Sequence, residues 1–160
     1  MPKLVKTLLA AAAGLAAFAG VSSTATAQEG GGHVGPLAQN CWGTKQETRI
    51  LRAHVGNQRI GRVELWYSPE QGGTNCVITY NEVAGKATTY AYLIVDDNRN
   101  RDNTGRKEPG DRVAYDEGYY EYYAGASYLR NTNGKCVRFG GSVLARAGDD
   151  SFGSGWVHCS

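Results

Sequence analysis

The stretch that decides the fold class of this chain is GRVELWY, residues 61–67. Two sets of side chains alternate along it: Val63, Leu65 and Tyr67 against Arg62, Glu64 and Trp66. A period of two residues is typical of a β-strand that has one buried face. The stretch therefore predicts a half-buried strand rather than a helix.

The same period continues through most of the chain. Further strands are expected at TRILRAHV (48–55), NCVITYNE (75–82), TTYAYLIVD (88–96), RVAYD (112–116) and KCVRFGGSVLARA (135–147), with GWVHC (155–159) as a short closing strand. Turn signals rich in glycine, asparagine and proline separate these stretches, and no segment carries an apolar helical stripe with caps. We expect a single all-β domain, a small antiparallel β-sandwich or barrel.

The N-terminus has the three parts of a secretory signal. Lys3 and Lys6 precede an apolar run, and Ala25-Thr26-Ala27 offers small residues for cleavage. The run is shorter than the about 20 apolar residues that span a bilayer. We therefore expect a signal peptide over residues 1–27, a flexible glycine-rich leader over 28–39 and the folded domain over 40–160. The protein should be secreted, to the medium or to the cell or spore surface, with no membrane anchor after cleavage.

The charge of the expected mature chain is balanced. Removing Lys3 and Lys6 from the 17 basic residues leaves 15, which equals the number of acidic residues. Nothing in that balance requires a nucleic acid as partner. Four arginines lie close together in the sequence, Arg49, Arg52, Arg59 and Arg62. We interpret them as a solvated strand face, because charge runs usually have that role.

Four cysteines in an exported chain predict two disulfides, for which three pairings exist. The cysteines contain no CxxC pair and have no nearby pair of histidines, which argues against a metal site. We expect the pairs Cys41–Cys76 and Cys136–Cys159, each closing a local pair of strands. Each could stabilise the fold by about 3–4 kcal/mol in the chain-entropy model.

Residues 96–111, DDNRNRDNTGRKEPGD, are expected to form a long exposed hairpin loop. Asp96, Asn98, Asn100 and Asp102 alternate in it as in a calcium-binding loop. Arg101 and Lys107 occupy the positions at which such a loop needs glycine and a bidentate glutamate. Cations at those positions repel calcium, so we expect no metal site and no cofactor.

Six of the ten tyrosines lie within YDEGYYEYYAGASYLR, residues 115–130. Read as one strand over 119–128, this stretch places tyrosines on both of its faces, so some rings must be accessible to solvent. Cross-strand pairing of aromatic side chains is their ordinary structural role. Exposed rings instead make contact surfaces for sugars, peptides or other copies of the protein. We expect Trp66, Tyr119 and Tyr123 to form such a binding surface.

The stretch DEGYYEYYAGASYL followed by GKCVRFGGSV resembles the C-terminal half of the spore-associated protein A family of secreted actinobacterial proteins. The family pattern is Asp-x-Gly, Tyr, Tyr-Ala-Gly, an aromatic strand, then Gly-x-Cys-Val with an aromatic before Gly-Gly. The matching residues are Asp116, Gly118, Tyr120, Tyr123, Ala124, Gly125, Tyr128, Gly134, Cys136, Val137, Phe139, Gly140 and Gly141. NCWG at 40 and TNCVITY at 74 are similar to the family's first two cysteine contexts.

The resemblance covers most of residues 40–159. This chain departs from the pattern at Phe139, where tryptophan is expected, at Ala126, where proline is expected, and across the charged loop 96–111. The resemblance implies an exported protein found with spores or aerial growth. It implies no catalytic chemistry and carries no catalytic residues.

Candidate catalytic groups are few in the sequence. Oxidised cysteines are not nucleophiles, and neither Ser142 nor Ser154 sits in a GxSxG elbow. A carboxylate pair for glycoside cleavage could come from Asp116, Glu117 and Glu121. A ribonuclease-type set could come from Glu64, Arg62 and His54, if they meet across neighbouring strands. His158, beside the last cysteine, is a poor position for a precise base.

We therefore expect a non-catalytic protein that acts at the cell or spore surface by binding wall polymer or protein. A secreted protease inhibitor that uses loop 96–111 as bait is the alternative, although this loop contains no cysteine to make it rigid. A small secreted hydrolase is the third possibility. No constellation of residues has the spacing that would identify one.

Overall fold

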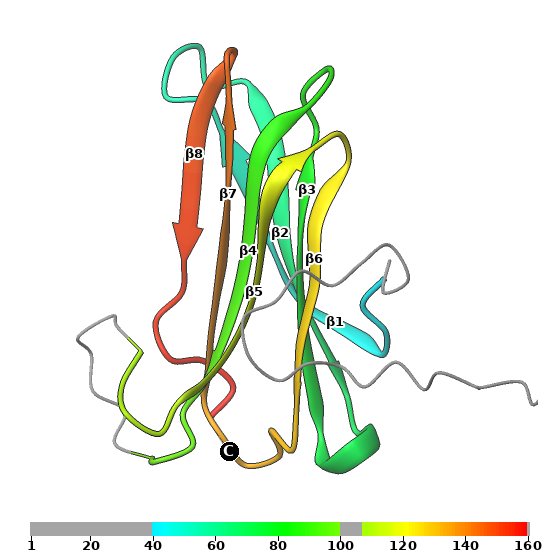
Figure 1. Ribbon diagram of the computed structural model, residues 1–160, viewed down its shortest axis with the longest axis vertical. Helices are drawn as coiled ribbons and strands as arrows, with labels where there is room; N and C mark the ends of the chain where they lie inside the picture. Colours follow the sequence, from blue (N-terminus) through cyan, green and yellow to red (C-terminus); the bar gives the residue numbers. More distant parts are fainter. Residues whose placement is uncertain (1–39, 100–106, 160) are drawn as a thin grey trace, which may run out of the picture.

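The chain folds into two four-stranded antiparallel sheets in the computed structural model, which describes residues 40–99 and 107–159 (Figure 1). The strands are β1 (Thr44–Arg52), β2 (Arg59–Ser68), β3 (Thr74–Asn81), β4 (Ala87–Val95), β5 (Arg112–Tyr120), β6 (Tyr123–Arg130), β7 (Val137–Ala145) and β8 (Gly148–Gly153). The first sheet has the order β1-β2-β3-β6 and the second the order β5-β4-β7-β8. The expected all-β, sandwich-like fold is confirmed.

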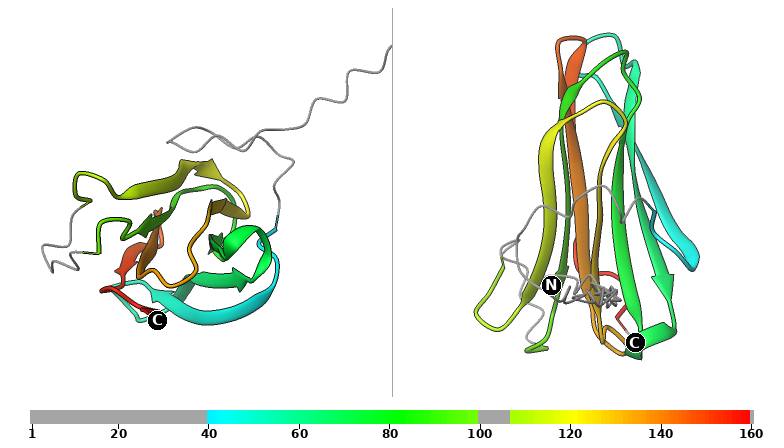
Figure 2. Two further views of the ribbon diagram at one scale, coloured as in Figure 1. Left: turned by 90° about the horizontal axis from the view of Figure 1, so that it is seen from below. Right: turned by 45° about the vertical axis from the view of Figure 1, so that its right-hand side comes forward.

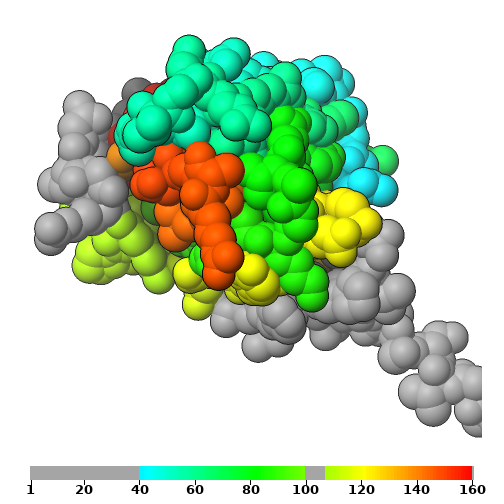
Figure 3. Space-filling model, turned by 90° about the horizontal axis from the view of Figure 1, so that it is seen from above, coloured from blue at the N-terminus to red at the C-terminus, as the bar shows by residue number. Residues whose placement is uncertain are grey.

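The two ends of the sandwich differ. Tight turns that connect β1 to β2, β3 to β4, β5 to β6 and β7 to β8 gather at one end, which we call the turn end (Figures 1 and 3). The opposite end, which we call the loop end, carries the β2–β3 segment with the short 3-10 helix η1 (Glu70–Gly72), the β6–β7 loop and the C-terminal segment (Figure 2). The β4–β5 connection, expected as loop 96–111, also leaves the loop end, and its residues 100–106 lie outside the described ones.

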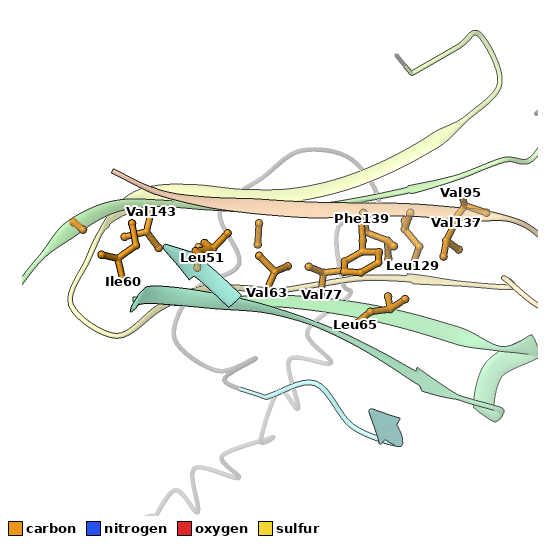
Figure 4. Close-up of a cluster of buried hydrophobic side chains, with 14 of the residues drawn as sticks. Leu51, Ile60, Val63, Leu65, Val77, Val95, Leu129, Val137, Phe139 and Val143 are labelled. Atoms are coloured by element: carbon orange, nitrogen blue, oxygen red, sulfur yellow. The ribbon is translucent and has the colours of Figure 1, made fainter. Parts of the chain in front are cut away.

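The core lies between the sheets. Side chains of Val63, Leu65 and Val77 in the first sheet face Phe139 and Val143 in the second, and all five are fully buried (Figure 4). The predicted burial of Val63 and Leu65 in GRVELWY is therefore confirmed. The burial of apolar surface between two such layers is the main favourable contribution to folding.

Small residues let the two sheets approach closely at one point. A Cβ atom on Gly141 of β7 would lie 2.0 Å from Oγ1 of Thr79 in β3. No side chain fits in that space, so the second glycine of the Gly-Gly pair is required by packing.

The tyrosine-rich stretch is not a single strand, and that expectation was wrong. β5 ends at Tyr120, a turn follows at Glu121 and Tyr122, and β6 begins at Tyr123 in the other sheet. The turn contains none of the residues that usually mark one, namely glycine, proline or asparagine. Tyrosines occur on both sides of this turn, so the sequence pattern does not reveal where the chain changes from β5 to β6.

The C-terminal segment also differs from expectation. Residues 155–159 form no strand, and Val157 makes a single bridge with Val137. The last strand is instead β8, GDDSFG, which had no predicted counterpart. It is an edge strand with one half-buried face and a single large apolar residue, Phe152, so its pattern is weak.

Both expected disulfides are present, Cys41–Cys76 with Cα atoms 5.6 Å apart and Cys136–Cys159 with Cα atoms 4.2 Å apart. Two disulfides are consistent with an extracellular protein. Within residues 40–99 and 107–159, no helix has the length and apolar character needed to cross a membrane. The expected signal peptide (1–27) and leader (28–39) lie outside the described residues, as do Asn100 and Asp102 of the calcium-like alternation.

Candidate binding face

The outer surface of the second sheet carries four tyrosines. In β4, Ala91 and Leu93 point into the core, so Tyr90 and Tyr92 point outward. Directly opposite residues of neighbouring strands share a face, and Tyr115 of β5 lies opposite Tyr92. Thr88 of β4 lies between Tyr119 of β5 and Leu144 of β7, so these two side chains point outward as well. We call the set Tyr90, Tyr92, Tyr115, Tyr119 and Leu144 the tyrosine face.

The rings of the tyrosine face form a connected group. Tyr90 and Tyr92 are stacked, with ring centroids 5.7 Å apart and planes inclined by 29°, and Tyr115 lies 6.2 Å from Tyr90. Tyr119 is 67% exposed, Leu144 48% and Tyr115 39%. Half-buried rings at the centre and exposed groups around them make an accessible apolar surface with a rigid middle.

Two glycines on neighbouring strands make room for Tyr92. A Cβ atom on Gly140 of β7 would lie 2.5 Å from Cε1 of Tyr92. A Cβ atom on Gly153 of β8, which pairs with Gly140, would lie 2.7 Å from the Tyr92 hydroxyl oxygen. The ring of Tyr92 can therefore lie against the backbone of both strands.

The hydroxyls of the tyrosine face are available to a ligand. Burial raises the pKa of Tyr90 and of Tyr92 above the ordinary tyrosine value, with Tyr92 and Glu117 adding to the effect at Tyr90. Both hydroxyls therefore stay protonated at neutral pH and can both donate and accept hydrogen bonds. Among the described residues, none of the four tyrosine hydroxyls on this face has a hydrogen-bond partner.

A charged group borders the tyrosine face toward the loop end. Arg138 pairs with Ile94, one outward position beyond Tyr92, and its guanidinium lies 5.5 Å from the Trp156 ring. Its Nε donates to the carbonyl oxygen of Ser154, while its buried Nη1 has no hydrogen-bond partner within residues 40–99 and 107–159. On the same side of β4, both carboxylate oxygens of Asp96 are buried and have no hydrogen-bond partner among the described residues. Buried unsatisfied groups are uncommon in native proteins, so this border is a candidate part of a site. No motif in the sequence indicated this border.

The three residues expected to form one binding surface lie on two. Tyr119 belongs to the tyrosine face, whereas Trp66 and Tyr123 point outward from the first sheet, on the opposite side of the sandwich. Trp66 donates a hydrogen bond from Nε1 to Oε2 of Glu64 (3.1 Å), and the Tyr123 ring packs edge-on against Tyr80 with centroids 6.2 Å apart. The three side chains therefore cannot contact one flat ligand together.

The outer surface of the first sheet is instead a network of ion pairs. Glu64 is 4% exposed and accepts hydrogen bonds from Arg62 (2.9 Å) and Lys45 (3.4 Å) as well as from Trp66. Arg62 also pairs with Glu82 and lies 3.8 Å from the centroid of the Tyr80 ring. Burial alone would raise the pKa of Glu64, but the hydrogen bond and charge of Arg62 outweigh it, so the pKa lies below its usual range.

The ribonuclease-type set is brought together only in part. Arg62 and Glu64 meet, as the spacing suggested, and their contact is an ion pair within the network. His54 lies exposed in the β1–β2 turn and is not among the hydrogen-bond partners of Glu64. Among the described residues, the hydrogen-bond partners of Glu64 are therefore Arg62, Lys45 and Trp66.

The acidic residues considered for glycoside cleavage also separate. Asp116 points toward the core, where it accepts hydrogen bonds from the Tyr120 hydroxyl (2.7 Å) and from the Gly125 backbone N–H (2.8 Å). Glu117 points outward beside Tyr90, and Glu121 lies exposed in the β5–β6 turn. Burial and the bond to Asp116 raise the pKa of Tyr120 to about 12.

These contacts explain part of the motif that carries the family resemblance. Asp116 joins β5 to β6 through the Gly125 N–H and also holds Tyr120 at the end of β5. A Cβ atom on Gly118 would lie 2.5 Å from Cζ of Tyr120. The Asp-x-Gly and Tyr-Ala-Gly elements therefore hold a hairpin that crosses between the sheets. Their role in this structure is to stabilise the fold.

No family model matches the chain, and the comparisons with curated proteins and with solved structures found no similar protein.

Proposed function

We propose that this is a secreted, non-catalytic protein of the spore-associated protein A type that binds a wall polysaccharide at the cell or spore surface. The binding surface is the tyrosine face. The resemblance, the N-terminal secretory pattern and the two disulfides support the location.

The observation that carries the proposal is the stacked, supported arrangement of Tyr90, Tyr92 and Tyr115 on one sheet surface. Sugar rings present apolar C–H groups on their faces and hydroxyls on their edges. Tyrosine matches both, because its ring is apolar and its hydroxyl forms hydrogen bonds. An apolar surface that a folded protein keeps accessible often marks a binding site.

The neighbours of the rings favour a polysaccharide over a protein partner. The row of paired residues that crosses the sheet through Tyr90 carries polar side chains, namely Glu117 in β5, Ser142 in β7 and Ser151 in β8. They offer polar contacts to hydroxyl groups within one or two residues of each ring. The middle of a protein–protein interface is usually depleted of such charged and small polar residues.

A retention assay on purified insoluble wall polysaccharide tests the proposal. The double variant Tyr92→Ala/Tyr115→Ala should lose about tenfold or more in affinity, equivalent to about 1.4 kcal/mol. The matched control is Tyr80→Ala, which removes an aromatic ring from the outer surface of the first sheet. A folded double variant that binds as strongly as the parent chain would exclude the tyrosine face as the binding surface.

A further inference from the structure

A polar pocket of about 230 Å³ opens at the loop end, separate from the tyrosine face. The β6–β7 loop supplies Asn133 and Lys135 to its wall, the first sheet supplies Gln46 and Tyr67, and the C-terminal segment supplies His158. Figure 2 shows this end from below, with the C-terminal segment beside the β6–β7 loop. A pocket of this volume has room for one sugar-sized group.

A disulfide brings the two basic side chains of the pocket together. Lys135 directly precedes Cys136 and His158 directly precedes Cys159, and these two cysteines are bonded to each other. The Val137–Val157 bridge, with backbone hydrogen bonds of 2.9 Å in both directions, aligns the same two segments. Lys135 and His158 are therefore held on adjacent segments of backbone, although 22 positions separate them in the sequence.

The charge of the pocket favours an anion. None of the described residues that line it is an aspartate or a glutamate. The nearest partner of Lys135 is Asp97, and this carboxylate also pairs with Arg112. Lys135 is therefore fixed at the pocket wall by this ion pair and is the cation that the described lining residues supply. Burial would raise the pKa of Asp97, but Arg112 and Lys135 hold it below its usual range, so the carboxylate stays ionised.

Hydrogen-bond donors remain available in the wall. The Tyr67 hydroxyl donates to Oδ1 of Asn133 (2.8 Å), and the amide nitrogen Nδ2 of Asn133 has no partner among the described residues. The His158 ring has none there either. Asn75, at the inner wall, donates to Thr132 (2.8 Å), which fixes the loop that carries Asn133. Donors beside the Lys135 ammonium suit an oxyanion.

We propose that this pocket binds an anionic sugar-sized group, one that bears a carboxylate or a phosphate. Lys135 supplies the charge, while Asn133 and His158 donate hydrogen bonds to the anion or to neighbouring hydroxyls. The observations that support this pocket are different from those that support the tyrosine face. Loss of one site therefore leaves the other proposal unaffected.

Titration of the processed chain, followed by two-dimensional NMR, tests the inference with three probes: glucuronate, glucose 1-phosphate and neutral glucose. We expect the amide signals of residues 132–135 and 158 to shift with at least one anionic probe. Its affinity should fall about tenfold in Lys135→Met, and raised ionic strength should weaken it. The glucuronate and phosphate arms show which anion is preferred. The matched control is Lys86→Met, because Lys86 is exposed in the β3–β4 turn at the opposite end.

Lys135→Met also removes the ion pair with Asp97, so two further variants keep the test independent of folding. Asn133→Ala and His158→Asn leave that ion pair in place, and asparagine accepts the positive φ of 55° at position 158. Each should weaken the anionic probe several-fold in a folded chain. The proposal is wrong if neither anion shifts the pocket signals, if neutral glucose binds equally well, or if these two variants and Lys135→Met bind like the parent chain.

Discussion

Tyr90 and Tyr92 lie stacked on the outside of β4, with ring centroids 5.7 Å apart and planes inclined by 29°. Residues two apart on a strand share a face, so their rings are neighbours by geometry alone. Their orientation depends on other strands, because Gly140 and Gly153 leave the space into which Tyr92 extends. The surface proposed to bind polysaccharide thus depends on two glycines of neighbouring strands, Gly140 and Gly153.

The variant Gly153→Ala tests this dependence. Its added methyl group would meet the Tyr92 hydroxyl at 2.7 Å, at the far end of a side chain, so the ring should move rather than the backbone. We expect polysaccharide affinity to fall several-fold and the free energy of unfolding to change by less than about 1 kcal/mol. Gly155→Ala is the control, because no atom lies within 4 Å of its Cβ position. Equal affinity for both variants would show that the position of Tyr92 is irrelevant to binding.

The variant Tyr120→Phe tests the support of Asp116, the buried carboxylate of β5 that also accepts a hydrogen bond from Gly125 of β6. It removes the hydrogen bond to buried Asp116 and should lower the free energy of unfolding by about 2 kcal/mol at neutral pH, measured by urea denaturation. Tyr119→Phe, on the exposed outer face, should change it by less than about 0.5 kcal/mol. A Tyr120→Phe chain as stable as the parent would contradict the role assigned to Asp116.

The raised pKa of Tyr120 also predicts an alkaline transition. Its pKa is about 12 in the folded chain, against the ordinary 10.0, so the folded state holds this proton more tightly than the unfolded state. The contribution to stability is complete below pH 10 and is lost as the pH rises toward 12. Tyr120→Phe should remove that component from a plot of unfolding free energy against pH. A plot that keeps the same slope in the variant would assign the transition to other groups.

The variant Glu64→Gln tests the ion-pair network on the first sheet. The pKa of Glu64 is lower in the folded chain than the ordinary value of 4.5 in the unfolded chain. The ionised carboxylate therefore stabilises the fold at pH values above 4.5, and this stabilisation is lost as the pH falls through the pKa of the folded chain. We expect a loss of about 2 kcal/mol at pH 7 that shrinks below pH 4. Glu70→Gln, at an exposed position in η1, should show no such pattern. A loss independent of pH would mean that the charge of Glu64 is not what stabilises the sheet.

The two disulfides should differ in what their removal affects. Replacing Cys136 and Cys159 by serine should cost about 3 kcal/mol of stability and should also abolish binding of the anionic probe, because Lys135 and His158 lose their link. Replacing Cys41 and Cys76 should cost about 4 kcal/mol, since the closed segment is longer, and should leave Lys135 and His158 connected. Calorimetry and the NMR titration give the two readouts. Retained probe binding in a folded Cys136→Ser/Cys159→Ser chain would contradict the role of this bridge.

The fold could be predicted from the sequence because its signals are local. Alternation such as that of Val63 and Leu65 identifies a strand and its buried side, and four cysteines in an exported chain indicate two bridges. The β5–β6 turn could not be predicted in this way, because Glu121 and Tyr122 carry no turn signal. β8 could not be predicted either, since an edge strand buries little.

The candidate site was predicted only at Tyr119. The alternation in TTYAYLIVD places Tyr90 and Tyr92 on one side of a strand, yet the neighbours of β4 come from residues about 25 and 50 positions further along the chain. Which sheet a strand joins is a non-local property. For that reason Trp66 and Tyr123, similar to Tyr119 in chemistry, lie on the opposite surface.

The most direct test of the polysaccharide-binding surface is to map backbone amide shifts while soluble wall-glycan fragments are added to the processed chain. The tyrosine face predicts that the largest shifts fall in β4, β5, β7 and β8, centred on Tyr90, Tyr92 and Tyr115. Shifts centred on Trp66 and Tyr123 in the first sheet, or no shifts at saturating fragment, would contradict it.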